Sequence, residues 1–211
     1  LGDGVIGTPD FSNSGTFELW SGTTLNLSSG NGTVSGDFII SSTATLQFSG
    51  GTFTFNPAAA ITGSGNVIFN GATVNLNDTI NVSAQNLSQS GGTWNLGNAD
   101  VKLSGHFTHT NGTFNADTST LTFNGGITQN VWIEANTDFY NVVVYTDTLL
   151  NQTVASGTST ILGDFTNYGM VRRSQVMTVG TFALGLTGIT ADVHTLGSLT
   201  NLQADRIGGN H

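Results

Sequence analysis

The sequence predicts an all-β fold, a right-handed parallel β-solenoid with coils of about 20 residues, followed by a short C-terminal β-element. Three observations lead to this prediction. A short glycine-threonine-apolar step returns at nearly constant spacing, apolar and polar residues alternate around each step, and residues that favour helices are scarce. Gly, Thr, Asn and Ser make up about half of the 211 residues, a composition typical of short strands and tight turns.

The repeated step occurs six times in the first half of the chain. Its glycines lie 17, 19, 20, 21 and 20 residues apart, at Gly15, Gly32, Gly51, Gly71, Gly92 and Gly112. An antiparallel sandwich or barrel also has short strands and frequent turns, but its successive strands have no reason to resemble one another at a constant lag. In a solenoid, equivalent residues of successive coils stack about 4.8 Å apart and form ladders of like residues. The repeat therefore favours the solenoid.

Alternation with a period of two places one set of side chains inside the solenoid and the other outside. We expect an outward threonine ladder that comprises Thr16, Thr33, Thr52, Thr73, Thr93 and Thr113. We expect an inward apolar ladder that comprises Phe17, Val34, Phe53, Val74, Trp94 and Phe114. A second outward column then runs through Glu18, Ser35, Thr54, Asn75, Asn95 and Asn115. Like charges stacked at this spacing repel along the whole ladder, which explains why charged residues are only 8% of the chain.

The repeat divides the chain into three parts. Residues 1–14 precede the first step, and we expect an N-terminal arm there that docks on a neighbouring molecule. Residues 15–173 are expected to form the solenoid, with regular coils to about residue 126 and less regular ones after it. Residues 174–211 alternate differently and predict a separate C-terminal β-strand element.

A longer motif appears where the repeat changes character. Residues 123–131 read Phe-Asn-Gly-Gly-Ile-Thr-Gln-Asn-Val, and residues 139–144 read Phe-Tyr-Asn-Val-Val-Val. They resemble a repeat of large bacterial surface proteins, F-x-G-x-x-x-Q-x-I and then F-x-N-L-x-I, and residues 157–165 are similar to its glycine-rich last part. The earlier coils resemble the β-solenoids of filamentous-haemagglutinin-like and autotransporter-type adhesins, and residues 180–211 resemble a β-sandwich module of such proteins. The resemblance implies secretion, surface display and a role as stalk, adhesin or matrix fibre, with no particular ligand.

Charge and composition argue against several classes of partner. The net charge is −9, and the first of only four Lys and Arg residues is Lys102. Binding a nucleic acid or an anionic membrane surface takes clustered cations, so we expect neither partner. No apolar run approaches the roughly 18 residues of a membrane span, so we expect no membrane insertion. An acidic, cysteine-free chain rich in Thr and Asn fits an extracellular bacterial protein.

The sequence does not predict an enzyme. Parallel β-helix lyases combine a carboxylate cluster that holds Ca²⁺ with an Arg or Lys base. Lys102 is the only cation before residue 172, and it lies two residues from Asp100, so the two are expected to pair on one strand face. His106 and His109 face opposite sides of a strand, and we interpret them as surface histidines that flank a buried Phe107.

No cofactor is predicted. Calcium is the one metal that the composition allows, because 13 carboxylates and many Asn side chains supply oxygen atoms. However, the chain has no EF-hand loop and no calcium-binding nonapeptide. The acidic residues of the probable turns occur singly, at Asp117, Asp138, Asp147 and Asp164, and we interpret them as solvated.

The function that these observations favour is structural: an extracellular building block of a surface stalk, filament or sheath that self-associates head to tail. The alternative is a monomeric adhesin that binds a glycan or a host protein, with Trp20 as the exposed contact, since Trp94 falls in the inward ladder. A more remote alternative is ice binding by stacked threonines. Only Thr52 and Thr54 form a Thr-x-Thr pair within the expected ladder, which weakens that alternative.

Overall fold

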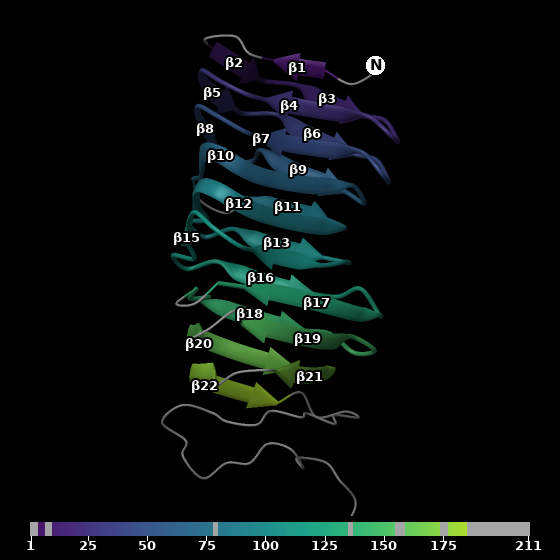
Figure 1. The fold of residues 1–211 in the computed structure, drawn as a ribbon, viewed down its shortest axis with the longest axis vertical. Coiled ribbons are helices and arrows are strands. Elements are labelled where there is room, and N and C mark those ends of the chain that lie inside the picture. The colour runs from purple at the N-terminus through teal and green to yellow at the C-terminus, as the bar shows by residue number, and fades with distance from the viewer. Residues whose placement is uncertain are drawn as a thin grey trace, which may run out of the picture.

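The computed structural model describes residues 4–6, 10–77, 80–134, 137–154, 159–173 and 177–184. Within them the fold is an all-β parallel solenoid with coils of about 21 residues and no helix, which confirms the predicted fold class. The coils stack along one axis (Figure 1). No helix suited to crossing a membrane is found in this part of the chain.

Each coil passes through three faces, and every strand pairing is parallel. The first face contains β1 (Gly4–Ile6), β4 (Thr24–Leu27), β7 (Thr45–Phe48), the first halves of β10 (Asn66–Leu76) and β12 (Asn86–Asn95), β14 (Phe107–His109), β17 (Thr128–Ile133), β19 (Leu149–Val154) and β21 (Met170–Arg173). The second face contains β2 (Asp10–Asn13), β5 (Asn31–Val34), β8 (Thr52–Phe55), the second halves of β10 and β12, and β15 (Thr113–Asn115).

The third face is a continuous sheet of nine strands. It contains β3 (Thr16–Leu19), β6 (Asp37–Ile40), β9 (Ala60–Gly63), β11 (Asn81–Ala84), β13 (Asp100–Leu103), β16 (Thr120–Phe123), β18 (Asn141–Val144), β20 (Ser159–Asn167) and β22 (Met177–Leu184). Residues 4–6 and 10–13, which we expected in an N-terminal arm, thus belong to strands of the first coil. At the other end β22 extends the third face beyond residue 173. The remainder of the expected C-terminal element, residues 174–176 and 185–211, lies outside the described residues.

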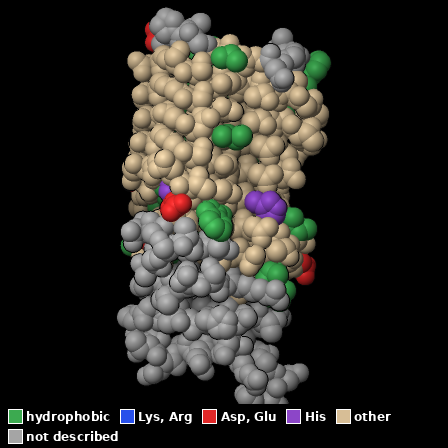
Figure 2. All heavy atoms as spheres, viewed as in Figure 1, with side chains coloured by type: hydrophobic (Ala, Val, Ile, Leu, Met, Phe, Trp, Pro, Cys, Tyr) green, Lys and Arg blue, Asp and Glu red, His purple; other side chains and the backbone are tan. Residues whose placement is uncertain are grey.

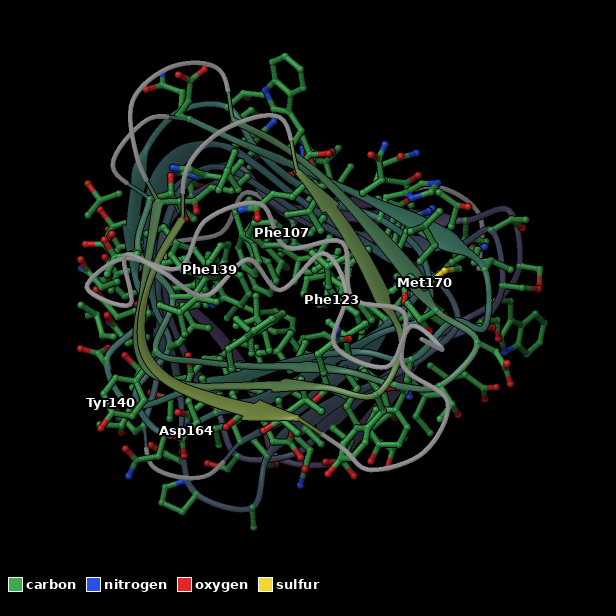
Figure 3. All side chains as sticks on the ribbon, turned by 90° about the horizontal axis from the view of Figure 1, so that it is seen from below. Phe107, Phe123, Phe139, Tyr140, Asp164 and Met170 are labelled. Carbon is green, nitrogen blue, oxygen red and sulfur yellow. The ribbon has the colours of Figure 1, made fainter. Side chains whose placement is uncertain are left out.

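Aromatic and aliphatic side chains from the three faces fill the interior. The rings of Phe48, Phe69 and Trp94 stack on one another, with centroids 5.4 and 4.6 Å apart. Two further rings continue this column toward the C-terminus. The Phe114 centroid lies 5.4 Å from that of Trp94, and the Phe139 centroid lies 5.6 Å from that of Phe114. A view along the axis shows Phe107, Phe123 and Phe139 in the interior and Tyr140, Asp164 and Met170 at the periphery (Figure 3). One apolar column therefore links successive coils.

One corner of the solenoid is longer than the others. Phe107 pairs with Val131, 24 residues further on, and the extra residues lie between β16 and β17. Gln129 is fully buried there, and its Nε2 donates hydrogen bonds to the carbonyl oxygens of Leu103 (2.8 Å) and Gly105. Its Oε1 accepts a hydrogen bond from the Gly125 N–H (2.8 Å). The glutamine of the longer sequence motif thus satisfies backbone groups at a corner that the strand ladder leaves open.

Candidate functional surface: the outer ladders and the end of the first coil

Four of the expected ladder threonines lie side by side on the second face. Thr52 pairs with Thr73, Thr73 with Thr93, and Thr93 with Thr113. The neighbouring inward residues stack in the same register, and they are Phe53, Val74, Trp94 and Phe114. The first three are fully buried, whereas Phe114 is half-buried.

The structure places Thr16 and Phe17 elsewhere. They lie in β3 on the third face, where Thr16 pairs with Asp37 and Phe17 with Phe38. The expected register is wrong here because Gly15 lies at the corner before the third face, and its carbonyl oxygen accepts the Asp37 N–H. Gly15 therefore corresponds to Gly36, not to the glycine of the next step.

Thr33 and Val34 lie on the second face, but two residues away from the expected register. Thr33 pairs with Thr54, and Val34 with Phe55. The spacing of the repeated step aligns Gly32 with Gly51. The structure instead places Gly30 next to Gly51, and the Thr52 N–H donates to the Gly30 carbonyl oxygen. Gly32 instead occupies an inward position, where a Cβ atom would lie 2.5 Å from the Phe53 ring. Glycine makes room for that ring.

The corrected register produces two outward columns, which we call the second-face array. One column contains Asn31, Thr52, Thr73, Thr93 and Thr113, and the other contains Thr33, Thr54, Asn75, Asn95 and Asn115. Neither column includes Glu18 or Ser35, which we expected there, because Glu18 lies in β3 and Ser35 follows β5. The asparagines hydrogen-bond along the axis: the Asn95 amide donates to Asn75 (2.6 Å), and the Asn115 amide donates to Asn95 (2.5 Å).

Charged side chains are sparse on the described surface, as one side of the molecule shows (Figure 2). Lys102 and Asp100 form an ion pair of 2.7 Å on the third face, as the sequence predicted. Both side chains are partly exposed, so the pair contributes little to stability. No group of three or more His, Cys, Asp or Glu side chains suited to a metal ion occurs among the described residues.

Of the two histidines that we interpreted as surface residues, His106 lies at the surface and His109 does not. His106 lies outside, where its Nδ1 accepts the Asn130 N–H (3.0 Å). His109 is buried, with 4% of its surface exposed, and its ring packs 5.9 Å from that of Phe114. Burial lowers the pKa of His109 below its ordinary 6.5, and the negative charge of Glu134 opposes this shift. Alternation within β14 accounts for the burial, because His109 shares the inward side with Phe107.

The tryptophans divide as expected between core and surface. Trp94 is fully buried, and Trp20 is 62% exposed at the corner between β3 and β4. Trp132, an outward residue of β17, is 42% exposed. The ring of Trp20 is thus accessible to a ligand, but exposure alone does not make it a binding site.

The first coil ends in an open strand edge. Among the described strands, β1, β2 and β3 each pair on one side only, with β4, β5 and β6. Ile6, Phe11 and Phe17 are half-buried at this end of the core. An edge of this kind can pair with another strand.

Comparison with protein-family models, with curated proteins and with solved structures gives no match to this chain.

Proposed function

We propose that this chain is a structural segment of an extracellular stalk, filament or sheath. The observation that carries the proposal is the uninterrupted parallel sheet of the third face, in which nine strands stack in register. Each of the seven inner strands is held by hydrogen bonds to the coils on either side, whereas β3 and β22 end the sheet. The aromatic column fills the interior that this sheet encloses with the other two faces. Such a stack transmits force along its axis because every coil is clamped by its neighbours.

The scarcity of charge on the outer faces supports the same proposal. Stacked asparagines hydrogen-bond to one another at the inter-strand spacing, as Asn75, Asn95 and Asn115 do. Columns of like charge at this spacing would repel along the rod. The resemblance of the sequence to bacterial surface solenoids points to the cell surface as its location.

Growth of a filament requires contacts between copies, and the open edge of the first coil is the surface that we propose for them. Strands β1, β2 and β3 offer backbone hydrogen-bonding groups, and Ile6, Phe11 and Phe17 offer apolar surface. A second copy that stacks on this edge continues both the sheets and the core. The contact is heterologous, so it does not close into a ring.

Light scattering and electron microscopy over a range of protein concentrations test the proposal. We expect elongated assemblies that lengthen with concentration in the wild type. The double variant Ser12→Lys with Glu18→Lys places charge at the first-coil edge and is expected to remain monomeric. The control variant Thr62→Lys with Ser88→Lys places two lysines on outward positions midway along the rod and is expected to assemble. A wild type that stays monomeric at all concentrations refutes self-association.

The second-face array supports a second candidate, ice binding. The ten side chains of the array form two columns without charge in five successive coils, and Asp10 and Ser12 continue these columns into the first coil. The register expected from the sequence instead interrupted the second column with Glu18 and Ser35. Positions two apart on a strand and one coil apart define a regular grid of hydroxyl and amide groups. Thermal hysteresis of the purified chain tests this candidate. Thermal hysteresis is expected to vanish in Thr73→Lys and to persist in Thr62→Lys on the third face, and its absence in the wild type removes the candidate.

A further inference from the structure

The backbone ladder of the second face is interrupted next to β15. Strand β15 pairs with β12, and no described strand pairs with its other edge. The next coil returns to this face at Phe139, whose bridge is to Ile161 on the far side. The core remains continuous beneath the interruption, because the Phe139 ring lies 5.6 Å from that of Phe114 and 5.8 Å from that of Phe107. The strands therefore separate at the surface but not in the interior.

A cavity of about 520 Å³ lies at this interruption. Its lining includes His109, Asn111, Thr113 and Phe114 from one coil, and Glu134 and Thr137 from the next. The volume falls in the range of small-molecule sites, roughly 300–1,000 Å³. The second-face array ends here, so the cavity is a local feature of one corner and not a part of the repeat.

The lining combines fixed polar groups with one aromatic ring. Thr137 is buried, and its hydroxyl donates to the Glu134 carbonyl oxygen (2.9 Å), which ties the two residues together. The Asn111 amide oxygen accepts the Gly112 N–H (2.8 Å), which leaves the amide NH₂ group for a ligand. His109 is more than nine-tenths buried, and its Nδ1 has no hydrogen-bond partner. Phe114 is half-buried and offers ring surface to the cavity.

We propose that this cavity binds a neutral sugar residue of a glycan. Sugar hydroxyls both donate and accept hydrogen bonds, which matches a carboxylate acceptor on Glu134, an amide donor on Asn111 and the hydroxyl of Thr113. The C–H face of a pyranose ring can pack on the Phe114 ring. The lining residues include no Lys or Arg, which argues against a phosphate or a carboxylate ligand. Among the described residues, no three His, Cys, Asp or Glu side chains come together as a metal ion would require.

The proposed sugar site is separate from the structural role of the solenoid, and it lies away from the residue that the sequence suggested for glycan contact. The sequence pointed to Trp20, which lies at the corner between the third and first faces. The cavity lies at the corner between the first and second faces, several coils further along the chain. A side site of this kind leaves the ends of the solenoid free, so sugar binding and self-association can be measured independently.

Saturation-transfer NMR and calorimetric titration of the full chain test the proposal. The probes are the methyl glycosides of glucose, galactose, mannose and N-acetylglucosamine. Glu134→Gln keeps the shape of the side chain but removes the charged acceptor, and Asn111→Ala removes the amide from an exposed turn with little effect on folding. Glu18→Gln is the matched control, because Glu18 is an exposed carboxylate of the first coil.

We expect at least one glycoside to bind, and both cavity variants to weaken its binding by about tenfold or more, since each loses a hydrogen bond to the ligand. The Glu18→Gln control should bind like the wild type. Absence of binding by all four glycosides at millimolar concentration overturns the proposal. Binding that Glu134→Gln and Asn111→Ala leave unchanged also overturns it, because the sugar then occupies another surface.

Discussion

At the scale of single residues, the turns between the third and first faces hold a conformation that suits glycine. Gly22 has a φ of 77°, and Thr43, one coil further, has a φ of 63°. The two turns are equivalent, because Ser21 Oγ and Ser42 Oγ lie 3.4 Å apart. A left-handed backbone costs an L-residue about 1–2 kcal/mol, and β-branched residues are among the least suited to it. Thr43 therefore stores strain that Gly22 avoids.

This strain gives a stability prediction. Thr43→Gly should raise the free energy of unfolding by about 0.5–1 kcal/mol, since relief of strain exceeds the added freedom of the unfolded chain. The reverse change, Gly22→Thr, should lower it by a similar amount. Urea unfolding followed by circular dichroism measures both. A destabilised Thr43→Gly contradicts the prediction.

Gln129 is a second residue whose environment predicts a clear effect. Gln129→Leu keeps the corner between β16 and β17 filled but leaves the carbonyl groups of Leu103 and Gly105 and the Gly125 N–H without their partner. Leu103 and Gly105 are buried, and an unsatisfied buried group costs about 1–3 kcal/mol, so the two carbonyl groups alone give an expected loss of about 2–6 kcal/mol in the free energy of unfolding. Gln47→Ala, on the outer side of β7, is the control and should change it by less than about 0.5 kcal/mol. Equal urea midpoints for the two variants would falsify the role assigned to Gln129.

His109 predicts how stability depends on pH. Burial lowers its pKa in the folded protein below the ordinary 6.5, so the unfolded chain binds a proton more readily than the folded chain. The contribution of His109 is thus complete above pH 6.5 and declines as the pH falls below that value. Unfolding in urea at several pH values between neutral and mildly acidic measures this slope. His109→Phe removes the titrating group and should flatten this slope, and an unchanged slope in that variant contradicts the prediction.

At the scale of the strand, charged substitutions within a ladder test whether repulsion between stacked like charges explains the scarcity of charged residues in the ladders. Thr73 and Thr93 are direct partners on the second face, about 4.8 Å apart. Thr73→Lys and Thr93→Lys should each have a small effect alone. Together they should lose a further 0.2–1 kcal/mol or so through repulsion, and the pair Thr73→Lys with Thr93→Glu should gain a similar amount. Double-mutant cycles at low and high salt measure the coupling, and a coupling that salt does not weaken argues against charge as its cause.

The ladders also show how far sequence reasoning reaches in this fold. The period, the parallel pairing and the inward-outward alternation follow from composition and spacing, because a coil that repeats must stack like on like. The register at Thr33 did not follow, because Gly30 and Gly32 both suit a corner in the sequence. In the structure Gly30 has the left-handed φ of 82° that a corner requires, whereas Gly32 faces inward against the Phe53 ring. The burial of His109 was deducible from its alternation with Phe107. The cavity beside His109 could not be deduced from the sequence, because it arises where the chain returns at Phe139 without pairing with β15.

At the scale of the whole molecule, the described coils form a one-dimensional array. Strand β10 pairs with β7 and β8 on one side and with β12 on the other, and more distant coils reach it only through these neighbours. Stability in such an array is approximately a sum of coil terms and neighbour terms. A globular domain with one core responds differently to a severely destabilising substitution, because such a substitution lowers the stability of all parts of the domain together.

A buried charge in a central coil tests whether the solenoid loses stability locally, coil by coil, or as one unit. Val74 is fully buried in β10, and Val74→Asp places an unpaired carboxylate in the apolar interior at a cost of several kcal/mol. We expect hydrogen-exchange mass spectrometry to show lost protection in β8, β10 and β12, with protection retained in β16 and β18, which lie two or more coils away. The control Ser83→Asp changes the outer side of β11 and should leave the pattern of the wild type. Protection that falls equally in all strands after Val74→Asp would mean that the solenoid unfolds as one unit, and that a stalk built from it fails as a whole instead of coil by coil.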